Sequence, residues 1–153
     1  METGFVVDLF VVDQHLGALL DAAIAGTGLT ASTFAVYTQL ERGALTPRQL
    51  SEILGIKPTT LSGYLATMQR HGHLSRAKHQ RDGRSSLLQL TEAGRDKVRE
   101  CRPAMRRAIQ AISANLGCAE DVRAARELIG RIDRAILAAR ATLTTPRRPV
   151  SRT

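Results

Sequence analysis

Residues 45–95 read LTPRQLSEILGIKPTTLSGYLATMQRHGHLSRAKHQRDGRSSLLQLTEAGR, and this stretch decides the fold. It opens with the signals of a helix start. Thr46 can cap the helix, Pro47 suits the first helical position, and Gln49 completes a Thr-x-x-Gln capping box. Apolar side chains then recur at helical spacing, at Leu50, Ile53 and Leu54. We therefore expect a short helix that begins at the capping box.

A glycine turn separates this helix from the next. Gly55 is expected to end the first helix, because glycine adopts the left-handed conformation needed just past a C-terminus. Pro58 can begin a second helix with its φ already set, and Gly72 ends it. The buried stripe of this second helix is predicted to be Leu61, Leu65 and Met68. Two such helices are typical of a helix-turn-helix, whose second helix enters the DNA major groove, although an ordinary helical hairpin is the alternative.

Two predicted strands follow, at Leu74–Lys78 and Ser86–Leu90. The segment HQRDGR between them contains the turn dipeptide Asp-Gly and places Arg81 and Arg84 at the tip of a hairpin. Such a tip suits a minor groove, whose negative potential attracts arginine, or the adjacent phosphates. A solvated polar turn is the alternative for the tip alone. The hairpin and the preceding helices together predict a winged helix-turn-helix.

Two segments, LTPRQLSEILGIKPTTLSGYLATMQRHGHLSR and DGRSSLLQLTEAG, resemble the MarR family of bacterial transcriptional regulators. The second matches that family's wing pattern of Asp, any residue, Arg, and a hydrophobic strand ending in Leu-Thr, with Gly94 three residues later. The resemblance implies that Arg84 enters the minor groove and that Asp82 helps to orient it. The chain departs from many relatives at Gly63 in the recognition helix, where a basic or long polar residue is common. Glycine there either permits a close backbone approach or removes a contact.

Composition and charge favour a helical, polyanion-binding protein. The 153 residues suit one domain or one compact subunit of an oligomer, and the low aromatic content of 3% favours helices over a β-sandwich. The net charge of +8 is unevenly placed: residues 1–41 contain no Lys or Arg and five acids, giving −5, and the remainder carries 22 − 9 = +13. General solubility would explain the total charge, but the asymmetry indicates a part that faces a polyanion.

The first helix is predicted from Phe5 to about Ala25 and is apolar over most of its girth. Such a helix must be buried on more than one side. Polar residues within it make it a poor transmembrane span, and it lacks the basic region of a signal peptide. A second helix, capped by Thr30, is expected to end near Gly43 and to pack under the helix-turn-helix.

Two long helices are predicted after the wing. One runs from Glu92, behind a Thr91 cap, to about Asn115, and Pro103 inside it is expected to kink or divide it. The other runs from Glu120 to about Ala141. These two helices and the first helix together have more apolar surface than one small winged domain can cover. We infer a symmetric homodimer in which helices from both chain ends are intertwined.

The predicted fold is therefore mainly α with a small β-hairpin, a winged helix-turn-helix lobe plus a helical dimerisation region from both chain ends. The expected domains are an N-terminal dimerisation helix, a winged DNA-binding lobe, C-terminal dimerisation helices and a flexible basic tail, at residues 1–28, 29–95, 96–143 and 144–153.

The predicted function is that of a sequence-specific DNA-binding transcriptional regulator of a pseudo-palindromic operator. Repression is commoner than activation in the resembled family. The predicted DNA-binding residues have hydroxyl groups or charged side chains, or lie where the backbone of the recognition helix can approach DNA closely. They are Lys57, Pro58, Thr59, Thr60, Ser62, Gly63, Thr67, Arg70, Arg76, Lys78, Arg81, Asp82 and Arg84.

The resemblance also implies a small-molecule effector between the dimer helices and the DNA-reading lobe. Candidate pocket residues are Phe10, His15 and Tyr37, although plain core packing is the stronger interpretation of Tyr37. We expect no cofactor and no metal site, because the cysteines and histidines do not form a zinc pattern. Cys101 is expected to pack in the core and Cys118 to lie in a turn, with oxidant sensing as the minor alternative.

The chain shows no phosphate-binding glycine loop and no nucleophile elbow, so we expect no enzyme. A cytoplasmic, nucleoid-associated location and no membrane partner are expected. Two other functions stay open: a winged protein-interaction module, which has no need for a basic hairpin tip, and a sequence-neutral nucleic-acid binder.

Overall fold

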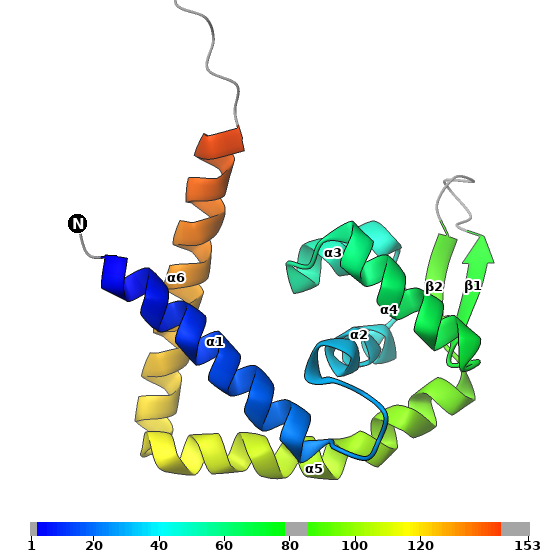
Figure 1. Cartoon of the computed structure of the whole chain (residues 1–153), viewed down its shortest axis with the longest axis horizontal. Coiled ribbons are helices and arrows are strands. Elements are labelled where there is room, and N and C mark those ends of the chain that lie inside the picture. Colours follow the sequence, from blue (N-terminus) through cyan, green and yellow to red (C-terminus); the bar gives the residue numbers. More distant parts are fainter. Residues whose placement is uncertain (1–2, 79–85, 145–153) are drawn as a thin grey trace, which may run out of the picture. The chain divides into compact units, whose positions relative to one another are not determined.

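The computed structural model describes residues 3–78 and 86–144 (Figure 1). Its elements are α1 (Thr3–Ala23), α2 (Ala31–Arg42), α3 (Pro47–Leu54), α4 (Pro58–Arg70), β1 (Leu74–Lys78), β2 (Ser86–Leu90), α5 (Glu92–Leu116) and α6 (Ala119–Thr144). The predicted mainly α fold with a small hairpin is confirmed. No helix in the described ranges combines the length and the hydropathy that crossing a membrane requires. The chain divides into two compact units, residues 1–108 and residues 109–153.

The start of α3 has the predicted capping box. The Thr46 hydroxyl accepts the Gln49 backbone N–H at 3.2 Å, and the Gln49 side-chain oxygen accepts the Thr46 N–H at 2.8 Å. Gly55 follows α3 with φ of 66°, the left-handed conformation that the sequence predicted. The turn into α4 is fixed further by the Ser51 hydroxyl, which donates to the Ile56 carbonyl at 2.6 Å. The helix-turn-helix geometry therefore follows from local chemistry.

The hairpin pairs β1 with β2 antiparallel, from Leu74 opposite Leu90 to Lys78 opposite Ser86, with the predicted strand bounds. An isolated antiparallel bridge joins a third segment of the chain to this hairpin. The Leu88 N–H donates to the Leu45 carbonyl at 2.9 Å, and the Leu45 N–H donates to the Leu88 carbonyl at 3.2 Å. The residue just before α3 is thereby tied to the wing, a long-range pairing that the sequence analysis did not predict.

A single apolar core lies under the helix-turn-helix and the hairpin. The predicted stripe of α4 is buried in it, and so are four residues of α2 and the inward-facing leucines of β2. Its buried members are Ile24, Phe34, Val36, Tyr37, Leu40, Leu50, Leu61, Leu65, Met68, Leu74, Leu88, Leu90, Val98 and Cys101. Burial of these side chains is the main stabilising contribution to the lobe.

The start of α5 is locked against the start of β1. The Thr91 hydroxyl accepts the Gly94 N–H at 3.1 Å and donates to the Gly72 carbonyl at 2.7 Å. A Cβ on Gly94 would lie 2.3 Å from the His73 carbonyl oxygen, closer than real contacts allow. Glycine at the end of the Leu-Thr-x-x-Gly pattern therefore permits α5 to approach the backbone that leads into the wing.

Three expectations need correction. Ile53 is 54% exposed rather than part of the buried face of α3, because the core lies on the Leu50 side of that short helix. Pro103 does not divide α5, which is one continuous helix through that residue. Packing of Cys101 and Met105 against the core on both sides of the proline supports the helix there. The first helix begins and ends two residues earlier than expected, and Ile24, the residue after its end, is fully buried.

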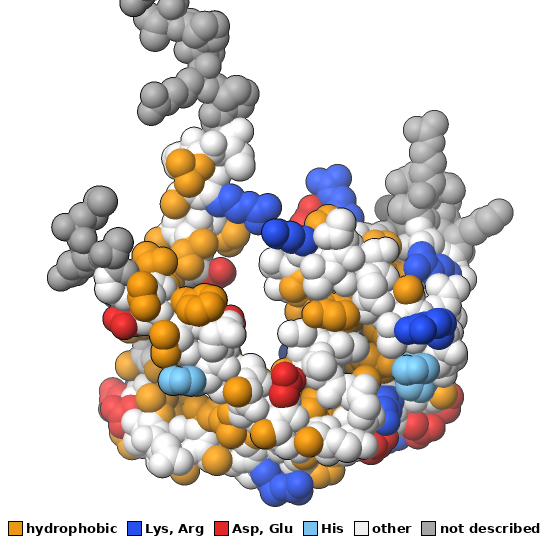
Figure 2. All heavy atoms as spheres, viewed as in Figure 1, with side chains coloured by type: hydrophobic (Ala, Val, Ile, Leu, Met, Phe, Trp, Pro, Cys, Tyr) orange, Lys and Arg blue, Asp and Glu red, His pale blue; other side chains and the backbone are white. Residues whose placement is uncertain are grey.

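Large apolar side chains remain exposed along α1, as Figure 2 shows for one face. Phe5, Val6, Phe10 and Val12 are each more than half exposed. In the second unit, α6 has no buried residue over its 26 positions, and Ile129 is 64% exposed. Within its own unit, each of these helices thus has an exposed apolar face.

Candidate nucleic-acid interface

One side of α4 is anchored in the core and the other faces solvent. Pro58 occupies the first turn, and Leu61, Leu65 and Met68 are buried. The positions between them, Thr59, Thr60, Ser62 and Gly63, are exposed. A helix held by one stripe in this way presents a rigid row of short hydroxyl groups and one bare stretch of backbone. Short hydroxyls of this kind can contact base edges or phosphates.

Two basic side chains beside this face are held by neighbouring polar groups. Arg70 donates from Nη2 to the Thr67 hydroxyl at 3.1 Å. Arg76 on β1 donates from Nε to the Gln69 side-chain oxygen at 3.3 Å and from Nη1 to the Ser86 hydroxyl at 3.4 Å. The second arginine therefore connects α4 with both strands, and its guanidinium is oriented before any ligand arrives.

The remaining predicted residues divide into two groups. Lys57 is the exposed N-cap residue of α4, and Lys78 is the last residue of β1. The wing-tip residues Arg81, Asp82 and Arg84 lie outside the described residues. Of these candidates, the structure brings Pro58 and Ser62 of α4 to the same hollow as Arg76 of β1.

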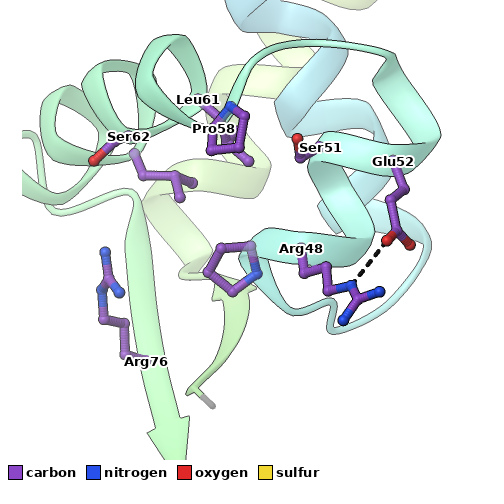
Figure 3. Close-up of a pocket in the computed structure, with 9 residues that line it drawn as sticks. Arg48, Ser51, Glu52, Pro58, Leu61, Ser62 and Arg76 are labelled. Carbon is purple, nitrogen blue, oxygen red and sulfur yellow. Dashed lines mark hydrogen bonds and ion pairs between the residues drawn. The ribbon is translucent and has the colours of Figure 1, made fainter. Parts of the chain in front are cut away.

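A hollow of about 460 Å³ lies between α3, α4 and β1 (Figure 3). In that view Arg48 and Glu52 come from α3, Ser62 from α4 and Arg76 from β1. The lining residues are Pro47, Arg48, Ser51, Glu52, Pro58, Leu61, Ser62, Leu65 and Arg76. The sequence analysis did not select Arg48. Its signal was an arginine in the first turn of a helix, where the helix dipole favours an acid.

The charge of this segment is almost entirely positive. Between Glu41 and Asp82 the only carboxylate is Glu52. The same segment carries seven basic residues, which are Arg42, Arg48, Lys57, Arg70, Arg76, Lys78 and Arg81. A surface with this balance attracts polyanions and repels basic partners.

The effector candidates lie in different surroundings. Tyr37 is 1% exposed in the core, and its hydroxyl lies 2.8 Å from His73 Nδ1. Burial raises the pKa of Tyr37 to about 12, with a smaller contribution from Cys101. The pKa of His73 is lowered by burial first, and then by the positive fields of His71 and Lys97. Tyr37 therefore has the core role that the sequence favoured, whereas Phe10 and His15 are exposed on α1.

The cysteines lie where the sequence placed them, since Cys101 is buried and Cys118 is exposed. Within residues 3–78 and 86–144, no group of three or more histidine, cysteine or acidic side chains could hold a metal ion.

Comparison with known proteins agrees with this geometry. Residues 23–85 match the family model described as MarR family. This part of the chain is similar to that family. The match covers α2, α3, α4 and β1, which include the helix-turn-helix and the first strand of the wing.

A curated relative, the HTH-type transcriptional repressor YetL of Bacillus subtilis, is 25% identical over 112 residues, or 71% of this chain and 67% of YetL. PcaV, a transcriptional regulator from Streptomyces coelicolor solved with its natural ligand, is 25% identical with a TM-score of 0.76, covering 89% of this chain and 94% of PcaV. A mutant MarR from E. coli, solved with operator DNA, shares the fold with a TM-score of 0.77 at 22% identity, covering 85% and 94%. The chain is thus similar to transcriptional regulators.

Proposed function

We propose that this MarR-like transcriptional regulator binds a pseudo-palindromic operator as a homodimer and represses transcription there. The observation that carries the proposal is the exposed face of α4. It holds hydroxyl groups and bare backbone, on a segment with a single carboxylate between Glu41 and Asp82. Similarity to YetL, a repressor, and to the MarR structure with operator DNA supports the proposal.

In this proposal α4 lies in the major groove. Thr59, Thr60, Ser62 and Thr67 contact base edges or phosphates, while Gly63 permits the helix backbone to approach the DNA. Lys57, Arg70, Arg76 and Lys78 bind the sugar-phosphate backbone. For roughly six to ten phosphate contacts, affinity falls about 10³–10⁵-fold between 50 and 200 mM salt.

The wing extends from β1 and β2 toward the flanking minor groove. The wing-tip residues lie outside the described part of the chain, so their role rests on the family resemblance. Arg84 would enter the groove, Asp82 would orient it, and Arg81 would add charge near the phosphates.

The homodimer would be built from the chain ends. Uncovered apolar faces on α1 and on α6 support a second copy as the covering surface, because such faces are costly to leave in water. Two-fold symmetry then requires half-sites about one helical turn apart. In this arrangement residues 1–28 and 96–143 dimerise, 29–95 bind DNA, and 144–153 form a basic tail.

A small effector would act by changing the spacing of the two lobes. Similarity to PcaV, which was solved with its natural ligand, supports this part of the proposal. Coupling of this kind is typically worth about 1–3 kcal/mol. Phe10 and His15 remain the candidate contacts on α1, with Tyr37 acting from the core.

The test is fluorescence anisotropy on the DNA upstream of the protein's own coding region, against a scrambled duplex, with wild type and Arg84→Ala. The proposal expects tight, salt-sensitive and sequence-selective binding that weakens without Arg84. Equally weak binding to both duplexes, unaffected by Arg84→Ala, would instead favour the protein-interaction module.

A further inference from the structure

Helix α3 carries its two charges in the order that the helix dipole disfavours. Arg48 is in the first turn, beside the positive end of the helix, and Glu52 is in the last turn, beside the negative end. Arg48 Nε lies 2.9 Å from Glu52 Oε1, and the two side chains are 88% and 62% exposed. An exposed pair of this kind stabilises a helix little. Stability of α3 therefore does not explain why an arginine stands there.

The surroundings of the pair suggest another reason. Both side chains line the hollow between α3, α4 and β1, together with Ser62 of the recognition helix and the oriented Arg76 (Figure 3). In a helix-turn-helix the first helix crosses the DNA backbone while the second lies in the groove. Arg48 thus stands where the first helix meets the backbone, and Arg76 stands across the same hollow.

Glu52 is also the only carboxylate between Glu41 and Asp82, and it is bonded to one of the seven cations of that segment. Arg76 and Arg70, by contrast, are held by neutral groups. A carboxylate offers a guanidinium the same kind of acceptor as a phosphate does. Of these three arginines, Arg48 alone is bonded to a group that resembles the DNA backbone.

We propose that Arg48 binds a phosphate of the DNA backbone and that Glu52 competes with that phosphate for Arg48, so that Glu52 lowers the affinity of the protein for DNA. This inference rests on the proposed DNA-binding function. The exchange costs little, because the pair is exposed and screened by salt. It is also independent of base sequence, because phosphate contacts carry no direct sequence information.

The experiment measures anisotropy of the full-length protein on a random-sequence duplex, over a salt series from about 50 to 200 mM. The variants are Arg48→Ala, Glu52→Gln and the double variant. Glu120→Gln is the matched control, since it removes the same charge from an exposed ion pair with Arg123 on α6. Thermal unfolding confirms that each variant is folded.

Three results are expected. Arg48→Ala weakens binding and lowers the slope of log affinity against log salt by about 0.9 per protomer, the loss of one phosphate contact. Glu52→Gln binds roughly three- to fivefold more tightly than Glu120→Gln when two protomers bind. In the Arg48→Ala background, Glu52→Gln gains no more than Glu120→Gln does.

Other outcomes overturn the inference. If Arg48→Ala left the slope of log affinity against log salt unchanged, the proposed contact between Arg48 and a phosphate would be ruled out. An equal gain from Glu52→Gln with and without Arg48 would show that Glu52 acts by general charge alone. If wild type shows no salt-dependent binding to any duplex, the proposed function itself is wrong and this inference is lost with it, whereas normal wild-type binding with unaffected variants rejects only the role of Arg48.

Discussion

The winged lobe and the terminal helices use the same kinds of apolar residue in opposite ways. Phe34 on α2 is 6% exposed, whereas Phe10 on α1 is 63% exposed. The lobe completes its core within one chain, from residues far apart in sequence. The apolar faces of α1 and α6 are each exposed within their own unit. The difference teaches that the lobe completes its core within one chain, and it is the basis of our proposal that a second copy covers the terminal helices.

The largest expected effect concerns the terminal helices. Ile129→Asp places a charge on the exposed apolar face of α6 and should weaken the homodimer about a hundredfold or more, because an unpaired charge at an interface is costly. Sedimentation velocity over a concentration series measures the change. Thr142→Asp adds the same charge to the same helix at a polar position and should have little effect. If Ile129→Asp and Thr142→Asp had the same effect on dimer affinity, α6 would not lie in the dimer interface as we propose.

The next largest expected effect concerns the winged lobe. Gly94→Ala should lower the free energy of unfolding by about 2–3 kcal/mol, because its Cβ would collide with the His73 carbonyl oxygen. Urea denaturation measures it. Gly63→Ala is the matched control in α4, where a Cβ meets nothing within 4 Å, and it should stabilise by about 0.5–1 kcal/mol. A Gly94→Ala variant as stable as wild type would contradict the described packing.

Gly63→Ala also sharpens the comparison at the DNA surface. If α4 approaches DNA through bare backbone, the added methyl group should reduce affinity about five- to tenfold, the order of one lost base contact, although it stabilises the free protein. Anisotropy on the operator duplex measures this. Unchanged or tighter binding would show that Gly63 merely lacks a contact.

How much the sequence predicted depends on whether the determining contacts are local. The Thr46 capping box, the Gly55 turn and both strand bounds were correct, because each is set within a few residues. The Leu45–Leu88 pairing was missed, because nothing near either residue specifies its partner. Ile53 was placed on the wrong side, since helical spacing in eight residues leaves the edge of the buried face undetermined.

The same distinction holds for the candidate site. The α4 candidates were predicted from the pattern of the helix-turn-helix, and two of them, Pro58 and Ser62, line one hollow with Arg76 of β1. The closeness of Arg48, Glu52 and Arg76 around one hollow was not predictable, because it depends on how α3 and β1 pack against α4. The bond between Tyr37 and His73 spans 36 residues and was missed for the same reason.

The smallest expected effect is a pH dependence of the lobe. The pKa of His73 is lower in the folded state than in the unfolded chain. At pH values between these two pKa values, the unfolded chain therefore binds more protons than the folded protein. The stabilisation is complete above the unfolded pKa of about 6.5 and is lost as the pH falls toward the folded value. Urea denaturation between about pH 7.5 and 5.5 should show wild type losing more stability than His73→Gln. Parallel losses would exclude His73 as the cause.

The most direct test of the account is the number of chains bound per operator duplex, measured by sedimentation velocity with labelled DNA. We predict that the free protein is a dimer and that two copies bind one duplex with two half-sites. We also predict that Ile129→Asp abolishes this paired binding while the lobe stays folded. A monomer that binds a single site as tightly as wild type binds the full operator would contradict the claim that the terminal helices pair two DNA-binding lobes.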